Sequence, residues 1–192
     1  MTFSAVLVGH DSLTLACGRM LREAGHALRA VATRHAATQA WAEAEGVPVL
    51  APGEGLAGRL PGGFDWLLSV ANLDVLPPDV LARPRRGAVN FHDGPLPDYA
   101  GLNVPVWALL NGEARHGITW HLIGGGVDEG PVIAARRFAL DPGETAASLN
   151  AKCFAAALES FPEVMGELDG EPRPHLQDLS RRRLFRRTDR PD

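Results

Sequence analysis

The first half of the chain alternates between short apolar runs and amphipathic stretches, and this alternation most constrains the fold. A short, nearly continuous apolar run is typical of a strand covered on both faces. Strands and helices that alternate with short links favour a parallel sheet with right-handed crossovers. The sequence therefore predicts an α/β fold, an open, mostly parallel twisted sheet with helices on both faces. The predicted strands are Phe3–Gly9, Ala27–Thr33, Val47–Leu50, Phe64–Val70 and Gly87–Phe91, and the predicted helices among them span 13–25, 36–46 and 77–84.

The second half predicts a helix over 104–112, two strands over 116–124 and 131–140, and a long helix from Glu144. We expect Pro162 to kink or interrupt that helix, because proline removes a backbone hydrogen bond. The length of 192 residues fits one domain with a short appendage. We therefore expect a domain over 1–170 and a Pro/Arg-rich tail or linker over 171–192. From Ser180 onward the chain holds six arginines and two aspartates, which favours a solvated segment.

Composition excludes several classes of protein. The formal net charge of −4 does not favour a nucleic-acid binder. Both cysteines, Cys17 and Cys153, lie in helical patterns, so buried free thiols are expected rather than a disulfide framework. The N-terminus lacks the basic and apolar regions of a signal peptide, and no apolar run approaches the ~18 residues of a membrane helix. We expect a cytoplasmic protein without membrane contact.

The turn after the first predicted strand, VGHDSL, does not fit a dinucleotide site. That fingerprint needs G-x-G-x-x-G so that backbone amides can approach a pyrophosphate, and Gly9 is the one glycine here. We interpret His10 as a strand-end residue with a local polar partner.

Asn90 and His92 end the fifth predicted strand, before a loop stiffened by Pro95 and Pro97. Because they are two residues apart on a strand, their side chains leave the same face. Ligands of open α/β sheets bind at the carboxyl ends of the strands. On this pair alone, a packed histidine with a turn asparagine remains as good an interpretation as a functional pair.

Asp128 lies in the glycine-rich loop GGGVDEGP between two predicted strands. An aspartate that stabilises its own turn is one interpretation; a carboxylate that orients His92 is the other. With Asn90 as an oxyanion donor, this set suits attack of a nucleophile on a carbonyl carbon. No serine or cysteine nucleophile accompanies it, and His116 and His121 lie on opposite strand faces, so no metal is expected. The residues alone leave a transferase or a hydrolase open.

Residues 90–133 resemble the core of the folate-dependent formyltransferases, the family of methionyl-tRNA formyltransferase and glycinamide ribonucleotide transformylase, and the likeness extends loosely from Ala5 to Leu168. The motifs that carry the resemblance are Asn90-x-His92, Leu96-Pro97, Asn111-Gly112-Glu113, Gly117-Ile118-Thr119 and Asp128-Glu129-Gly130.

The resemblance implies a Rossmann-like formyltransferase fold and an enzyme with Asn90, His92 and Asp128 as catalytic residues. It also implies 10-formyltetrahydrofolate as the formyl donor, and attack of an amine through a tetrahedral intermediate. The residues expected to border the folate are Leu73, Asp74, Val75, Leu76, Gly94, Pro95, Leu96, Pro97 and Val127.

The amine acceptor is the open question. VGHDSL lacks the phosphate-binding turn of the glycinamide ribonucleotide enzymes, and only about twenty residues follow the core, where tRNA and amino-sugar enzymes carry a further domain. The stretches NFHDGPLP-x-YAGLN, HGITWH, LNAKCFAAALESF and the ending Arg-x-Asp-Arg-Pro resemble most the formylation domains at the start of nonribosomal peptide synthetases, which implies an aminoacyl group on a peptidyl carrier protein. The basic tail would then be a linker or, on its charge alone, a contact for an acidic carrier. A 10-formyltetrahydrofolate hydrolase, an amino-sugar N-formyltransferase and a non-catalytic folate-binding module are the alternatives.

Overall fold

The computed structural model describes residues 2–189. They divide into two compact units, one with the residues up to Asn90 together with 168–171, and the other with 91–167 and the C-terminal residues from 172. The first unit contains β1 (Ser4–Val8), α1 (Ser12–Glu23), β2 (Ala27–Ala32), α2 (Ala36–Ala44), β3 (Val49–Leu50), α3 (Leu56–Arg59), β4 (Trp66–Ser69), α4 (Pro78–Leu81) and most of β5 (Gly87–His92).

The strands of the first unit are parallel. β1 pairs with β2 on one side and with β4 on the other. β3 pairs with the far edge of β2, and β5 pairs with the far edge of β4. β1 is almost fully buried, as its continuous apolar run predicts. Each observed strand agrees with its predicted range to within two residues, whereas the short helix α3 lies in a Gly/Pro-rich link that the sequence analysis left without structure.

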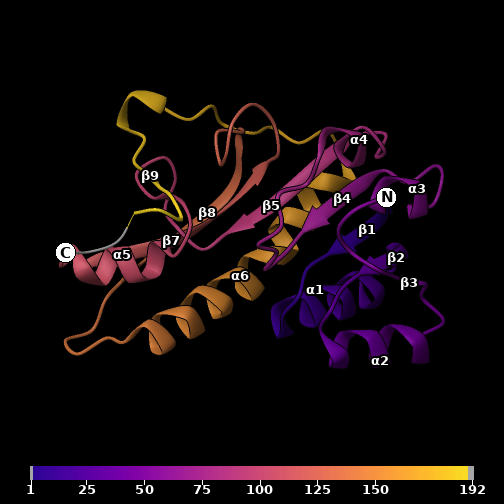
Figure 1. The fold of residues 1–192 in the computed structure, drawn as a ribbon, viewed down its shortest axis with the longest axis horizontal. Helices are drawn as coiled ribbons and strands as arrows, with labels where there is room; N and C mark the ends of the chain where they lie inside the picture. The colour runs from indigo at the N-terminus through magenta and orange to yellow at the C-terminus, as the bar shows by residue number, and fades with distance from the viewer. Residues whose placement is uncertain (1, 190–192) are drawn as a thin grey trace. The chain divides into compact units, whose positions relative to one another are not determined.

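Helices α1 and α2 lie side by side, with α1 against β1 and β2 and α2 against β3 (Figure 1). Asp11 begins α1 with a capping box that uses the Thr14 side chain, which satisfies amides that have no partner inside the helix. Gly18 of α1 allows the close contact with α2, because a Cβ there would lie 2.8 Å from the Trp41 ring.

The second unit holds an antiparallel pair of long strands, β7 and β8, and the long helix α6. Its short strands β6 and β9 form a separate two-stranded parallel sheet. The elements are the end of β5, β6 (Ala100–Gly101), α5 (Val104–Leu110), β7 (Arg115–Leu122), β8 (Val132–Ala139), α6 (Ala146–Asp169) up to residue 167, a 3₁₀ turn (Leu179–Arg181) and β9 (Leu184–Phe185).

The main sheet has seven strands in the order β3-β2-β1-β4-β5-β7-β8. Four of its pairings are parallel, and the pairing of β7 with β8 is antiparallel. The predicted fold class, an open and mostly parallel α/β sheet with flanking helices, is confirmed.

The sequence predicts that Pro162 kinks or interrupts the last long helix. The interruption is wrong, because α6 continues through Pro162 to Asp169 (Figure 1), and the kink stays a prediction. The final turn has its own reason to remain helical. Leu168 is fully buried, and its carbonyl accepts hydrogen bonds from Trp66 and Arg86. Burial and these bonds outweigh the one hydrogen bond that proline removes.

The arginine-rich segment expected to be solvated is exposed at Arg181 and Arg183, and its arginines also pair within the chain. Arg181 pairs with Asp98, Arg182 with Glu129 and Arg183 with Glu113. β9 follows these arginines and pairs with β6. Residues 172–189 therefore form an ordered part of the second unit; residues 190–192 of the expected tail lie outside the described residues.

Candidate active site

His92 is the last residue of β5 and is buried, with 5% of its surface exposed. Its Nε2 lies 2.6 Å from the backbone carbonyl of Tyr99. Because a carbonyl can only accept, Nε2 carries the hydrogen. Its Nδ1 lies 3.5 Å from Oδ2 of Asp128. The imidazole thus stands between the Tyr99 carbonyl and the Asp128 carboxylate.

Asn90 lies two residues before His92 on the same strand, and its backbone is paired opposite Ser69 of β4. Side chains two apart on a strand leave the same face, so β5 directs Asn90 and His92 to the same side of the sheet.

Asp128 occupies the loop between β7 and β8 with a φ of +55°, a left-handed conformation that non-glycine residues rarely adopt. Its carboxylate contacts three groups: His92, the Nε2 of His121 at 3.4 Å, and the Gly101 amide, which donates to Oδ2 at 2.8 Å. Burial opposes the ionised form, but the hydrogen bond from His121, the charge of His92 and the Gly101 amide outweigh it and lower the pKa of Asp128 to about 2. The carboxylate is therefore ionised near neutral pH.

His121 is a site residue to which the sequence analysis gave no role in the catalytic chemistry. Its Nδ1 lies 2.9 Å from the carbonyl of Leu122. Because its Nε2 contacts Asp128, that carboxylate stands between the imidazoles of His92 and His121. The register of the β7–β8 pair shifts between Trp120 and His121. The sequence signal that could have identified His121 is its position: it stands near the end of a strand that leads directly into the Asp128 loop.

His116 does not join this cluster. It is fully buried, its Nε2 bonds the carbonyl of Asp93, and its Nδ1 has no partner. Burial lowers the pKa of His116, more than the Asp93 carbonyl raises it. His116 is accordingly a neutral core residue.

The loop after His92 is held against β7. Thr119 donates to the carbonyl of Gly94 and accepts from the amide of Leu96. Gly94 cannot carry a side chain without displacing its neighbours, because a Cβ would lie 2.6 Å from the Tyr99 carbonyl and 2.8 Å from His92 Nε2. The backbone therefore passes directly beside the imidazole, and the folate contact of loop 94–97 stays a prediction.

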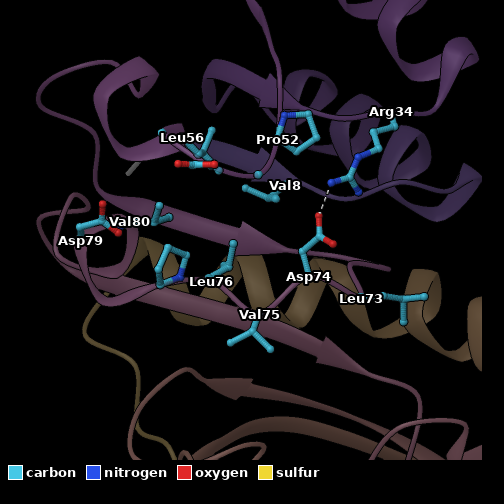
Figure 2. A pocket seen from close by; sticks show the side chains of 14 residues that line it. Val8, Arg34, Pro52, Leu56, Leu73, Asp74, Val75, Leu76, Asp79 and Val80 are labelled. Atoms are coloured by element: carbon cyan, nitrogen blue, oxygen red, sulfur yellow. Dashed lines mark hydrogen bonds and ion pairs between the residues drawn. The ribbon is translucent and has the colours of Figure 1, made fainter. Parts of the chain in front are cut away.

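The first unit contains a separate cavity of about 560 Å³. Figure 2 shows the side chains of Arg34 and Asp74 turned toward each other on its wall. Nη2 of Arg34 lies 2.7 Å from Oδ2 of Asp74. The volume lies within the range of ligand pockets. Four residues expected to contact folate, Leu73, Asp74, Val75 and Leu76, line this cavity together with Val8, Arg34, Pro77, Asp79, Val80 and residues 52–56. The other expected contacts, the 94–97 loop and Val127, belong to the second unit.

Other chemistries find little support in the described residues. Within residues 2–189 no cluster of three or more His, Cys, Asp or Glu side chains could hold a metal ion, and no helix there is long and apolar enough to cross a membrane. Cys17 and Cys153 are buried free thiols, and burial raises the pKa of both. Neither thiol is a nucleophile at neutral pH.

The family model described as "Formyl transferase" matches residues 63–165, more than half of the chain. The chain belongs to the formyl transferase family. The match includes the end of β5, the loop after it and the Asp128 loop.

Similarity to individual proteins agrees with this assignment. The chain is 34% identical over 151 residues to the methionyl-tRNA formyltransferase of Synechococcus sp. (strain JA-3-3Ab), a match that covers 75% of this chain and 47% of the relative. The chain spans about half the length of the curated relatives it matches first.

Two solved structures share the fold. Glycinamide ribonucleotide transformylase 1 from Symbiobacterium toebii has a TM-score of 0.80 at 22% identity, over 92% of this chain and 95% of that one. WlaRD, a sugar 3N-formyl transferase solved in the presence of dTDP and 5-N-formyl-THF, has a TM-score of 0.84 at 16% identity, over 100% and 72%.

Proposed function

We propose that this protein transfers a formyl group from 10-formyltetrahydrofolate to an amine. One observation carries the proposal: His92 and Asp128, 36 residues apart in the sequence, lie with Nδ1 and Oδ2 3.5 Å apart at a buried position inside a chain of the formyl transferase family. Membership of the family supplies the reaction class, and the pair supplies a group that moves a proton.

Asn90, His92 and Asp128 have separate roles in this proposal. Asn90 donates a hydrogen bond to the formyl oxygen as it gains negative charge. His92 keeps its hydrogen on Nε2, bonded to the Tyr99 carbonyl; its Nδ1 takes the proton from the attacking amine and returns that proton to the departing folate nitrogen. Asp128 holds the imidazole at Nδ1 and stabilises its charged form, which its own low pKa permits.

The folate supplies the activated formyl carbon. The cavity wall combines the apolar side chains of Leu73, Val75 and Leu76 with the carboxylates of Asp74 and Asp79, a mixture typical of sites for an organic ligand such as the folate. We propose that these residues, together with the 94–97 loop and Val127, bind it.

The acceptor we propose is the α-amino group of an aminoacyl unit carried by a larger partner, a peptidyl carrier protein. Relatives above 30% identity are named for methionyl-tRNA, which presents such an aminoacyl amine, and the motifs of this chain resemble synthetase formylation domains. Charge contributes less than the sequence implied, because Arg181, Arg182 and Arg183 pair with acidic side chains of the same chain.

The test is to incubate the protein with 10-formyltetrahydrofolate and one acceptor at a time: an aminoacyl carrier protein, methionyl-tRNA, glycinamide ribonucleotide or a dTDP-amino sugar. Release of tetrahydrofolate that depends on the carrier-bound amine is the expected result, and Asn90→Ala should lower kcat roughly 10²- to 10³-fold. Turnover with water alone would make the protein a hydrolase instead, and turnover with another acceptor would overturn the carrier assignment.

A further inference from the structure

The C-terminal segment, defined as residues 172–185, packs against the loop that carries Asp128. Its side chains contact four consecutive residues of that loop, 127–130. Gln177 donates from Nε2 to the carbonyl of Asp128 at 2.8 Å and to that of Gly130 at 2.6 Å. Arg182 donates to the carbonyl of Val127 at 2.6 Å and lies 3.5 Å from the carboxylate of Glu129. Two side chains of one segment therefore fix the backbone on both sides of the Asp128 carboxylate.

Backbone pairing anchors the segment at both ends. His175 and Val132 exchange two hydrogen bonds of 2.8 Å at the start of β8. At the other end, β9 pairs with Ala100 and Gly101 of β6. Gly101 is also the residue whose amide binds the Asp128 carboxylate. The segment thus holds both the loop that carries the carboxylate and the amide that orients it.

The contact at Gly101 leaves no room for a side chain. Its φ is +96°, and a Cβ would lie 2.1 Å from the carbonyl oxygen of Phe185. The Phe185 ring stacks on Tyr99 at 5.2 Å and on Trp107 at 5.1 Å. Tyr99 in turn provides the carbonyl that accepts from His92. The segment therefore reaches the partners of both members of the pair.

The Asp128 loop needs such support from outside. Three glycines, residues 124–126, precede Val127, and glycine has many conformations available in the absence of other contacts. Asp128 itself adopts a left-handed conformation, which persists where the surrounding structure determines it.

We propose that polar side chains of the C-terminal segment support the catalytic site, and that Gln177 is the positioning residue that holds Asp128 in place to orient His92. This inference rests on the proposed function. Gln177 touches no reacting atom; it acts through the backbone of the loop.

Three variants test the role. Gln177→Glu keeps the size of the side chain but replaces the donor with a carboxylate that faces two carbonyls. Gln177→Leu removes the donor without adding a charge. Leu176→Ala is the matched control, because Leu176 is the neighbouring residue and 87% exposed.

Two readouts are needed, kcat and KM for the folate, and amide hydrogen exchange of residues 124–130 in the full chain. We expect both Gln177 variants to lower kcat roughly 10- to 100-fold, with little change in KM, and to accelerate exchange in the loop, while Leu176→Ala matches the wild type. A Gln177→Glu protein with wild-type kcat, or with unchanged exchange in the loop, would overturn the inference.

The two proposals fail in different ways. If the wild type does not turn over, or His92→Ala remains active, the proposed reaction is wrong. The exchange of residues 124–130 still decides whether Gln177 holds the loop.

Discussion

Each unit of the molecule contains a histidine–aspartate pair of nearly the same spacing. His10 Nε2 lies 3.3 Å from Asp74 in the first unit, and His92 Nδ1 lies 3.5 Å from Asp128 in the second. Both histidines stand at or just beyond the end of a parallel strand. Spacing and position therefore do not distinguish the two pairs.

Their surroundings do. The Asp74 side chain is 41% exposed and pairs with Arg34, whose hydrogen bond is the main reason that its pKa is lowered. The Asp128 side chain is 10% exposed, and its ion pairs among the described residues are with His92 and His121. A permanently charged guanidinium already neutralises Asp74, so His10 adds little. Asp128 has no arginine or lysine partner among its described ion pairs and is held by two imidazoles and the Gly101 amide.

The largest expected effect is on kcat, which should depend on Asp128 far more than on Asp74. Asp128→Asn keeps the shape but removes the charge that holds His92, so kcat should fall roughly 10²- to 10⁴-fold. Asp141→Asn, an exposed carboxylate that pairs with Lys152, is the control for loss of one negative charge. An Asp128→Asn protein that folds and retains a tenth of wild-type kcat would show that the buried pair is not used in catalysis.

A smaller effect appears in stability at acid pH. The pKa of Asp128 is lowered from 3.8 to about 2, so its ionised form stabilises the folded protein above pH 4. That contribution, about 2 kcal/mol, is lost as the pH falls from about 4 toward 2. Urea unfolding of the wild type and Asp128→Asn between pH 6 and pH 2 measures it. The two free energies of unfolding should converge in acid; a constant difference would contradict the lowered pKa.

The smallest effect is expected at the exposed pair. Asp74→Asn should change the free energy of unfolding by less than about 1 kcal/mol, because water screens an exposed ion pair. Its kcat should stay near the wild-type value, while KM for the folate rises by up to about tenfold, since Arg34 loses its partner on the cavity wall. A loss of kcat as large as that of Asp128→Asn would remove the distinction between the two pairs.

The sequence predicted most where the physical cause is local. The apolar composition of the runs that form β1 to β5 is enough to predict that these strands are buried. The alternation of side chains along β5 likewise places Asn90 and His92 on one side of the sheet. The pairing of His92 with Asp128 required the resemblance, because nothing within either segment points to the other.

The sequence predicted least where partners are distant along the chain. The arginines at 181–183 were predicted to form a solvated run. Their partners, Asp98, Glu113 and Glu129, lie more than fifty residues away in the sequence, so no local pattern predicts the pairing. Gln177 had no local signal for the same reason. Pro162 predicted a break in α6 that the buried final turn of the helix overrides.

The most direct test of the account compares the two histidines. Amine-dependent release of tetrahydrofolate from 10-formyltetrahydrofolate should be measured for the wild type, His92→Ala and His10→Ala under the same conditions. We predict that His92→Ala loses at least about 10²-fold in kcat and that His10→Ala stays near the wild type. Equal losses in both variants, or full activity of His92→Ala, would contradict the assignment of the site to the His92–Asp128 pair.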